Sequence, residues 1–327
     1  MNKPTLCLVT PALADANNGN WQTARRWQHL LASHAVRIVR QWPDAEVQGT
    51  QDEVMLALHA RRSASAVQAW FAQRGPRGLG LVLTGTDLYR DIQHDRDARH
   101  ALQCAHSLVV LQGLGAQSLP EAHRHKSRVI LASGRARQTL AKTSRHLRVV
   151  MVGHLREEKD PLTLMTTARL LQGQKDILID HIGAALDPAW AQAAHETQAQ
   201  CPQYRWLGPL PHRDTLQRIQ RAHLLVHTSR MEGGAHVLME ALRSGTPVLA
   251  SRIDGNLGML GDNYPGTFAV GDAPALAHLL RQCRSGQAQA GGMLSHLTAC
   301  CVERATLFEP QAERAALHRW VQDLWTP

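Results

Sequence analysis

The chain has 327 residues, of which 44% are hydrophobic and 19% are charged, a composition typical of a globular protein with about two domains. This composition excludes a disordered or low-complexity chain, and no apolar run is long enough to span a membrane. The net charge of +9 favours anionic partners. Because the basic residues are scattered, a phosphorylated small molecule is favoured over nucleic acid or an acidic membrane surface.

Two further features of the sequence bear on its compartment. The apolar stretch near the N-terminus is too short for the core of a signal peptide. The six cysteines show no C-x-x-C or zinc-finger spacing, which is typical of reduced thiols. We therefore expect a cytoplasmic protein.

Segments typical of strands alternate with segments typical of amphipathic helices from residue 5 to residue 132. The expected strands are 5–10, 36–40, 54–58, 80–84, 107–111 and 127–132, and the expected helices include 20–33 and 64–74. Strand followed by helix, repeated, predicts parallel βα units. The polar stretch 133–146 has weak periodicity and predicts a linker.

A second series of the same kind follows the linker. Its expected strands are 148–153, 177–182, 204–207, 224–228 and 247–251, and its expected helices are 161–172, 188–199, 212–222, 235–244 and 273–286. We therefore predict an α/β fold in which two Rossmann-like, doubly wound domains, residues 1–138 and 146–309, face a cleft. The helical tail, residues 310–327, is expected to pack back on the first domain.

The stretch 229–251, SRMEGGAHVLMEALRSGTPVLAS, combines an expected loop, helix and strand. Glu232 and Gly233–Gly234 lie in the loop, and the helix is expected to begin near Ala235. The glycines would let a ligand approach the backbone, and the free N–H groups of a helix N-terminus attract phosphate. Glu240 follows Glu232 by about 12 Å along a helix, so the two carboxylates could hold opposite ends of a ligand. Two solvated glutamates are the alternative interpretation.

Three motifs of the first domain follow expected strands. N-N-G-N-W-Q-T-A-R-R-W at 17–27 follows the first strand, L-H-A-R-R-S at 58–63 opens a helix, and L-T-G-T-D-L-Y-R-D at 83–91 follows another strand. The carboxyl ends of parallel strands meet at one edge, so these motifs predict a second anion site there. Its candidate residues are His59, Arg61, Arg62, Ser63, Thr84, Thr86 and Asp87. Each motif alone is more typical of a turn or a solvated helix start.

The 229–251 stretch resembles the E-x7-E signature of nucleotide-sugar-dependent glycosyltransferases with the GT-B fold. The resemblance implies that Glu232, Gly233–Gly234 and Ala235 face the donor sugar and its distal phosphate, and that Glu240 holds the ribose. These enzymes also place a glycine loop near the donor phosphates, here Gly19 and Asn20. The resemblance implies no metal and no cofactor.

M-V-G-H-L-R-E-E-K-D-P at 151–161 resembles the element that opens the second domain of these enzymes, where an arginine and a lysine neutralise the departing diphosphate. Lys159 matches the lysine, although a solvated lysine is the alternative. His154, which follows Gly153, stands at the position of the arginine, and a histidine carries a full charge only when its pKa is raised. Arg156 is the other candidate cation. Lys159 and Arg156, together with the first glutamate of the E-x7-E signature, are therefore the implied catalytic residues.

The words NNGNWQTARRW, LHARRS, LTGTDLYRD and GHLREEKDP together resemble the selenosugar synthases of the selenoneine pathway. Those enzymes join selenophosphate to the sugar of a UDP-sugar. The resemblance implies UDP-N-acetylglucosamine or UDP-glucose as the donor, selenophosphate as the acceptor, bound by the candidate residues of the second anion site, and a new C–Se bond. A selenium anion is a strong nucleophile, so no general base is required.

Other functions remain open on the sequence. A glycosyltransferase with a hydroxyl acceptor would share the same donor motifs, and so would a UDP-sugar epimerase or hydrolase. A nucleotide-sugar or nucleic-acid-binding module without catalysis is the non-enzymatic alternative. Asp95-Arg96-Asp97 matches D-x-D, the metal motif of the other glycosyltransferase fold, but its charged surroundings predict a solvated helix, and we expect no metal site.

Overall fold

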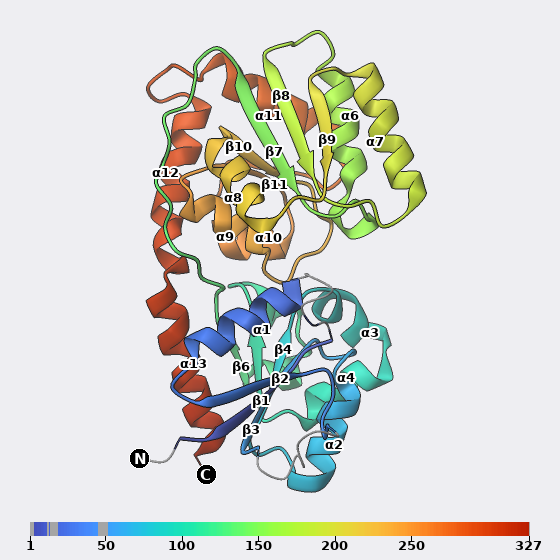
Figure 1. The fold of residues 1–327 in the computed structure, drawn as a ribbon, viewed down its shortest axis with the longest axis vertical. Coiled ribbons are helices and arrows are strands. Elements are labelled where there is room, and N and C mark those ends of the chain that lie inside the picture. Colours follow the sequence, from blue (N-terminus) through green and yellow to red (C-terminus); the bar gives the residue numbers. More distant parts are fainter. Residues whose placement is uncertain (1–2, 12, 14–18, 45–51, 327) are drawn as a thin grey trace. The chain divides into compact units, whose positions relative to one another are not determined.

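The structure of the chain, a computed structural model, describes residues 3–11, 13, 19–44 and 52–326. The chain folds into two units, which Figure 1 shows in the colours of the sequence. The first unit contains residues 1–133, 232–234 and 308–327, and the second contains residues 134–231 and 235–307. The division therefore falls after Ser133, whereas the sequence predicted a first domain that extends to residue 138.

The first unit is built on a sheet of parallel strands in the order β2-β1-β3-β4-β5-β6. The strands are β1 (Thr5–Val9), β2 (Ala35–Val39), β3 (Val54–Leu58), β4 (Leu79–Leu83), β5 (Ser107–Val110) and β6 (Ser127–Val129). Strands β3 and β4 are buried along their whole length. This is typical of a parallel sheet with helices on both faces.

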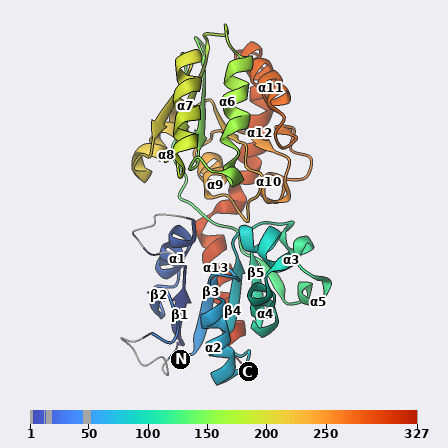
Figure 2. The same cartoon turned by 90° about the vertical axis from the view of Figure 1, so that its right-hand side faces the viewer.

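Helices cover both faces of this sheet (Figure 2). They are α1 (Gly19–Leu30), α2 (Ala64–Arg74), α3 (Ile92–His94), α4 (Arg96–Cys104), α5 (Glu121–Arg124) and α13 (Pro310–Trp325). Trp70 of α2 lies in the same buried cluster as Met55, whereas Trp27 of α1 and Trp320 of α13 lie in a second cluster with Leu56. Met55 and Leu56 are neighbours on β3, so successive side chains supply opposite faces of the sheet.

One buried carboxylate ties α13 to the first unit. Glu313 is 3% exposed and accepts hydrogen bonds from the indole Nε1 of Trp27 at 2.7 Å and from the N–H of Ser133 at 2.8 Å. It also forms an ion pair with Arg26 at 3.0 Å. The C-terminal helix therefore belongs to the unit in which the chain begins.

The second unit contains a parallel sheet in the order β12-β11-β10-β7-β8-β9. Its strands are β7 (Leu147–Val152), β8 (Ile177–Ile182), β9 (Tyr204–Gly208), β10 (Leu224–His227), β11 (Val248–Ser251) and β12 (Thr267–Phe268). Its helices are α6 (Pro161–Leu170), α7 (Pro188–Gln200), α8 (His212–Arg221), α9 (His236–Arg243), α10 (Asp254–Leu260), α11 (Ala273–Ser285) and α12 (Met293–Ala305). Six strands in each unit give the predicted pair of Rossmann-like domains.

The strand order of each sheet reverses at one place. In the second unit the chain runs from β7 outward to β9, then returns to β10 beside β7 and continues to the other edge. In the first unit the reversal lies between β1 and β3. Open α/β sheets bind ligands beyond the carboxyl ends of the strands at such a switch point, because the loops diverge there. The topology therefore singles out the loops after β7 and β10, and those after β1 and β3.

Residues 134–146, predicted as a linker, contain no helix or strand but are fixed to the second unit. The N–H of Arg137 donates to the carbonyl of Arg243 at 2.8 Å, and the side-chain amide of Gln220 donates to the carbonyl of Gln138. The His223 ring donates to the carbonyl of Thr143 at 2.8 Å. This segment is an anchored strap on the second unit, not a free connection.

Several elements differ from those expected. Helices α5, α10 and α12 and strand β12 were not expected. In α10, two of the seven residues are glycine, which has a low helix propensity. Asp95 lies outside a helix and caps α4, since its carboxylate accepts the N–H of Ala98 at 2.8 Å. In the described part of the chain, no helix has the length and apolar character needed to cross a bilayer.

Candidate active site

The switch point of the second unit is formed by two loops, the β7 loop (residues 153–160) and the β10 loop (residues 228–231). Because β7 and β10 are paired, the two loops leave the sheet side by side. The Thr228 hydroxyl donates to the carbonyl of Lys159 at 2.7 Å and lies 2.9 Å from that of Asp160. The N–H of Arg230 donates to the carbonyl of Glu158 at 2.9 Å. Backbone groups of the β7 loop are thus held by the β10 loop.

Three cationic side chains come from these two loops: Arg156, Lys159 and Arg230. The aliphatic stem of Lys159 lies against Gly153, where a Cβ atom would be 3.4 Å from the lysine Cδ. The guanidinium of Arg156 is 43% exposed and lies 3.8 Å from Glu158, and its buried Nε has no hydrogen-bond partner among the described residues. This set of cations at the carboxyl edge of a parallel sheet favours a bound anion.

Arg230 connects the loops through a charged contact. Its guanidinium lies 3.4 Å from the carboxylate of Asp160, which is 3% exposed and adopts a left-handed backbone conformation with φ of 45°. The same carboxylate accepts the hydroxyl of Thr163 at 2.8 Å. Asp160 therefore fixes the turn after Lys159 as well as the position of Arg230.

His154 does not have the properties of the expected cation. Its Nδ1 accepts the N–H of Ala184 at 3.2 Å, so that nitrogen carries no proton. Partial burial of the ring, together with the positive charges of Arg156 and Lys159, lowers the pKa of His154 below its ordinary value. The ring is therefore neutral near pH 7, and Arg156 is the cation at this end of the loop.

Gly183, directly after β8, lets a third loop approach the β7 loop. Its φ is 151°, and a Cβ atom at this position would lie 2.0 Å from the carbonyl oxygen of Gly153. The N–H of Gly183 donates to Gly208 at 2.9 Å, and the N–H of Gly153 donates to Ile182 at 2.9 Å. Only glycine fits this backbone contact.

Glu240 lies on α9 and is already paired within the second unit. Its carboxylate oxygen is 2.7 Å from Nε2 of His212, the first residue of α8. The Glu240 side chain is 17% exposed, and that of His212 is 53% exposed. A carboxylate held in this way keeps a second oxygen with which it can accept hydrogen bonds from hydroxyl groups.

The loop that begins with Glu232 belongs to the first unit. A Cβ atom on Gly233 would lie 2.5 Å from the nitrogen of Gly85, and one on Gly234 would lie 2.7 Å from the Cβ of Leu111. Both glycines therefore permit close contact with other parts of the chain, and the approach of a ligand to this loop stays a prediction. Ala235 precedes α9, which begins at His236.

At the switch point of the first unit, the motif after β1 is partly outside the described residues. Asn17 and Asn18 lie outside them. Gly19 is the first residue of α1, and its carbonyl accepts the hydroxyl of Thr23 at 3.0 Å. Asn20 follows it in the first turn of α1.

After β3, His59 is the centre of a buried cluster that we call the His59 cluster (His59, Thr86, Asp87 and Asp91). His59 is 3% exposed and has a left-handed φ of 75°, which is uncommon for a residue with a side chain. Its Nε2 lies 3.0 Å from the hydroxyl of Thr86, and its ring nitrogens lie 3.9 Å from carboxylate oxygens of Asp87 and Asp91. The structure thus brings together two motifs that are 27 residues apart in the sequence.

Asp87 and Ser63 have structural partners that differ from the predicted ligand. The carboxylate of Asp87 is fully buried and accepts N–H groups of Ala60 at 2.9 Å and of Thr84 and Gly85 at 2.8 Å. The hydroxyl of Ser63 donates to the carbonyl of Leu58 at 2.6 Å. These contacts position the loops after β3 and β4 and leave neither side chain turned toward solvent.

The two arginines of the same motif are exposed. Arg61 pairs with Asp95 at 3.0 Å, and its side chain is 56% exposed. The N–H of Arg62 donates to Nδ1 of His59 at 3.3 Å, whereas its guanidinium has no partner among the described residues. Both arginines are therefore open to solvent, and Arg62 differs from Arg61 in having no ion pair within the described residues.

Known proteins resemble the second unit in sequence. Residues 132–290 match the family Glycosyl transferases group 1. This region is therefore similar to group 1 glycosyltransferases. A relative, glycosyltransferase 1 domain-containing protein 1 of Xenopus tropicalis, is 25% identical over 275 residues, which are 74% of this chain and 77% of that protein.

Solved structures extend the likeness to the whole fold. Sucrose-phosphate synthase from Thermosynechococcus elongatus is 14% identical, with a TM-score of 0.79 over 99% of both chains. HepE from Anabaena, solved in complex with UDP-glucose, is 14% identical, with a TM-score of 0.75 over 98% of this chain and 100% of that one. The fold of the two units is the GT-B fold of glycosyltransferases.

The second unit contains three candidate site residues that were not expected from the sequence: Gly183, His212 and Arg230. Arg230 could have been predicted as a site residue from the sequence, because it is a basic residue in the loop just before Glu232. His212 could not have been predicted, since 28 residues separate it from its partner Glu240. No group of three or more His, Cys, Asp or Glu side chains within the described residues could hold a metal ion, and the absence of a metal cofactor stays a prediction.

Proposed function

We propose that this protein is a glycosyltransferase that transfers the sugar of a UDP-sugar, UDP-N-acetylglucosamine or UDP-glucose, to selenophosphate. The reaction forms a bond between selenium and C1 of the sugar. The bond between C1 and the diphosphate oxygen breaks, and UDP leaves with the bonding electrons. The observation that supports a UDP-sugar donor is the presence of three cationic residues, Arg156, Lys159 and Arg230, in the two loops at the switch point of the second unit.

Charge development explains why these three residues suit a diphosphate leaving group. As the C1–O bond breaks, negative charge grows on the diphosphate, and fixed cations stabilise that transition state more than the ground state. Glu240 would accept hydrogen bonds from the ribose, and Glu232 would accept them from the sugar. HepE was solved with UDP-glucose, which supports this class of donor. With three cations for the diphosphate, the reaction would need no metal ion.

The acceptor rests on the resemblance to selenosugar synthases and on Arg62. An exposed guanidinium beside a helix start can bind a phosphate-like dianion bidentately. The carboxylate of Asp87 is fully used by backbone N–H groups, as described above. An acceptor that is already a strong nucleophile fits such a site, because it requires no general base.

Product masses test the whole proposal. The protein is incubated with each of the two UDP-sugars and, in separate reactions, with selenophosphate, thiophosphate, phosphate or water. We expect UDP release together with a product that contains selenium. UDP release without an added acceptor would identify a hydrolase, and turnover only with hydroxyl acceptors would overturn the selenophosphate assignment.

A variant tests the acceptor side separately. Arg62→Ala should raise the KM for selenophosphate about tenfold or more, as expected for loss of a charge-assisted contact, and leave the affinity for the UDP-sugar unchanged. Arg99→Ala removes the same charge from an exposed position of α4 and is the matched control. Parental acceptor kinetics in Arg62→Ala would contradict this site.

A further inference from the structure

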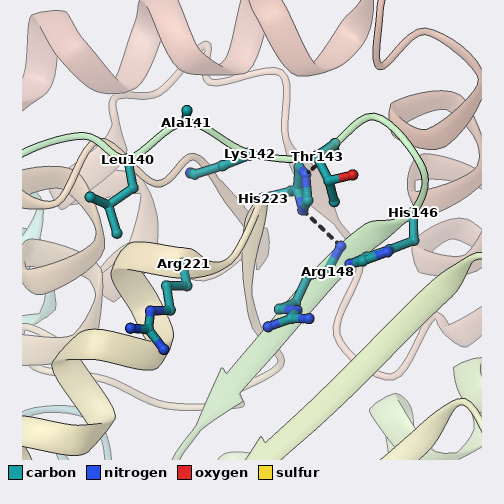
Figure 3. Close-up of a pocket in the computed structure, with 8 residues that line it drawn as sticks. All are labelled: Leu140, Ala141, Lys142, Thr143, His146, Arg148, Arg221 and His223. Carbon is teal, nitrogen blue, oxygen red and sulfur yellow. Dashed lines mark hydrogen bonds between the residues drawn. The ribbon is translucent and has the colours of Figure 1, made fainter.

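A hollow of about 430 Å³ lies in the second unit, away from the loops described above. Its wall is formed by the strap, the start of β7 and the end of α8 (Figure 3). The lining residues are Leu140, Ala141, Lys142, Thr143, His146, Arg148, Arg221 and His223. Its size is within the range of small-molecule sites.

The charged residues that line this hollow are all basic. Lys142, Arg148 and Arg221 reach it from three different segments, as Figure 3 shows. No acidic residue is among the lining residues, and none of the three cationic side chains has a hydrogen-bond or ion-pair partner in the described part of the chain. An anion that enters the hollow therefore meets cationic side chains and no competing carboxylate among the lining residues.

The frame of the hollow is rigid. His223 uses both ring nitrogens, because Nδ1 accepts the N–H of Arg148 at 2.9 Å and Nε2 donates to the carbonyl of Thr143 at 2.8 Å. Arg284 donates to the carbonyl groups of Ser144 and Arg145, both at 3.1 Å. The strap that carries Lys142 is therefore held in place without a ligand, which lowers the entropic cost of binding one.

Carboxylates near this part of the unit do not neutralise the hollow. Asp176, whose carbonyl accepts the N–H of Leu147, pairs through its side chain with Arg284 at 2.6 Å. Burial without any compensating carboxylate lowers the pKa of Lys142 to about 8. Burial and the charges of Lys142, His146 and Arg148 also lower the pKa of His223.

The hollow is distinct from the proposed donor site. Arg148 lies at the start of β7, whereas the β7 loop begins at Gly153, roughly 16 Å farther along the strand. His223 directly precedes β10, and Arg221 ends α8. The hollow thus lies at the amino edge of the sheet, opposite the edge where Rossmann-like domains bind their nucleotides.

We propose that this hollow is a second anion site that binds a phosphoryl dianion through Lys142, Arg148 and Arg221. The ligand is either free phosphate or a phosphomonoester whose carbon skeleton contacts Leu140 and Ala141. Bound there, a dianion bridges the strap, β7 and α8. The site is independent of the proposed transferase reaction.

Lysine NMR can observe this site directly, because the chain contains only five lysines, Lys3, Lys126, Lys142, Lys159 and Lys175. Reductive ¹³C-methylation keeps the charge of each lysine and labels it. Inorganic phosphate and glucose 6-phosphate are titrated at constant ionic strength, with glucose and chloride as controls. We expect the Lys142 signal to shift and the pKa of Lys142 to rise as the dianion binds. Whichever of the two ligands binds more tightly shows whether the site prefers free phosphate or a phosphomonoester. Any response of Lys159 reports the proposed donor site separately.

Two charge-matched variants decide the interpretation. Arg221→Gln should weaken the Lys142 response about tenfold or more, because it removes one charged partner of the ligand. Arg145→Gln changes an exposed arginine of the strap that does not line the hollow, and it should leave the response unchanged. A Lys142 signal that does not respond to either phosphate, or an equal response in both variants, would overturn the proposal. Unchanged spectra outside the site show that each variant is folded.

Discussion

At the residue scale, the structure of the β7 loop distinguishes two candidate cations, His154 and Arg156, that the sequence could not distinguish. His154 accepts a backbone N–H and has a lowered pKa, whereas Arg156 carries a fixed charge with an unsatisfied Nε. Lys159 extends along Gly153 in the same loop. The fixed charges of this loop therefore come from arginine and lysine, not from histidine, and these are the charges that we propose for the departing diphosphate.

Arg156→Ala should lower kcat by roughly ten- to hundredfold, because it removes a cation that stabilises charge in the transition state. His154→Ala should have a much smaller effect. Burial, together with the charges of Arg156 and Lys159, lowers the pKa of His154 below its ordinary value of about 6.5. The ring is then already neutral at pH 7, and kcat should not fall as pH rises from 7 to 8. Steady-state kinetics against pH measure this, and Arg156→Lys should recover part of the activity. A rate that declines with rising pH, and loses that decline in His154→Ala, would assign the role to His154.

Glu240→Ala should weaken UDP binding by about 1.5–3 kcal/mol, as expected for hydrogen bonds to a charged group. The proposed partner is the ribose, so calorimetry should show the loss with UDP alone as well as with UDP-sugar. Glu232→Ala should leave UDP affinity intact and reduce turnover, since its proposed partner is the sugar. Glu196→Ala on the exposed surface of α7 is the control. Unaltered UDP affinity in Glu240→Ala would contradict the ribose assignment.

At the scale of elements, α13 shows how one side chain assigns a helix to a unit. Glu313 joins α13 to α1 through Arg26 and Trp27 and to the chain at Ser133, all inside the first unit. Because the carboxylate is buried, it contributes to stability only while its hydrogen-bond and ion-pair partners are present. Trp320, about two turns further along the same face of α13, packs edge-to-face on Trp27.

Glu313→Ala should lower the free energy of unfolding of the first unit by about 3–5 kcal/mol, because Arg26 and two N–H groups would be left buried without their acceptor. Urea unfolding followed by tryptophan fluorescence measures this, since Trp27 and Trp320 lie in the affected core. Gln311→Ala on the exposed side of α13 should have little effect. A midpoint in Glu313→Ala that equals the control would mean that the buried carboxylate does not stabilise the helix.

At the scale of the whole molecule, histidines with a lowered pKa make stability depend on pH. The chain has nineteen histidines beside a net charge of +9, so acidification adds strong positive charge. Five of them have a pKa lowered in the folded chain, chiefly by burial: His34, His123, His154, His181 and His223. His181 is the most strongly affected, because it is fully buried beside Tyr204 and its pKa falls to about 3.

Stability should therefore decrease as pH falls below about 6.5. A histidine with a lowered folded pKa binds more protons when unfolded, so each one costs about 1.4 kcal/mol per pH unit between its unfolded and its folded pKa. For His181 that window runs from 6.5 down to about 3. Urea unfolding at several pH values should show a shallower slope in His181→Gln than in the parent. His296→Gln, at an exposed site, should keep the parental slope; equal slopes in all three proteins would contradict the prediction.

The sequence by itself determined the positions of most helices and strands, the parallel α/β class and the resemblance to GT-B glycosyltransferases. These depend on local information: hydrophobic periodicity marks strands and helices, and the motifs at 151–161 and 229–251 are contiguous. The match of residues 132–290 to group 1 glycosyltransferases agrees with that interpretation. Specificity for selenophosphate stays a prediction.

Only the tertiary structure decided the strand order, the protonation of His154, the buried role of Asp87 and the grouping of Lys142 with Arg148 and Arg221. Each depends on residues that are distant in the chain, and burial and pairing arise only when those residues meet. The type of a residue gives the charge of its side chain, but it does not give the partners of that side chain. For that reason the sequence located the candidate cations, and the fold determined which of them are available to a ligand.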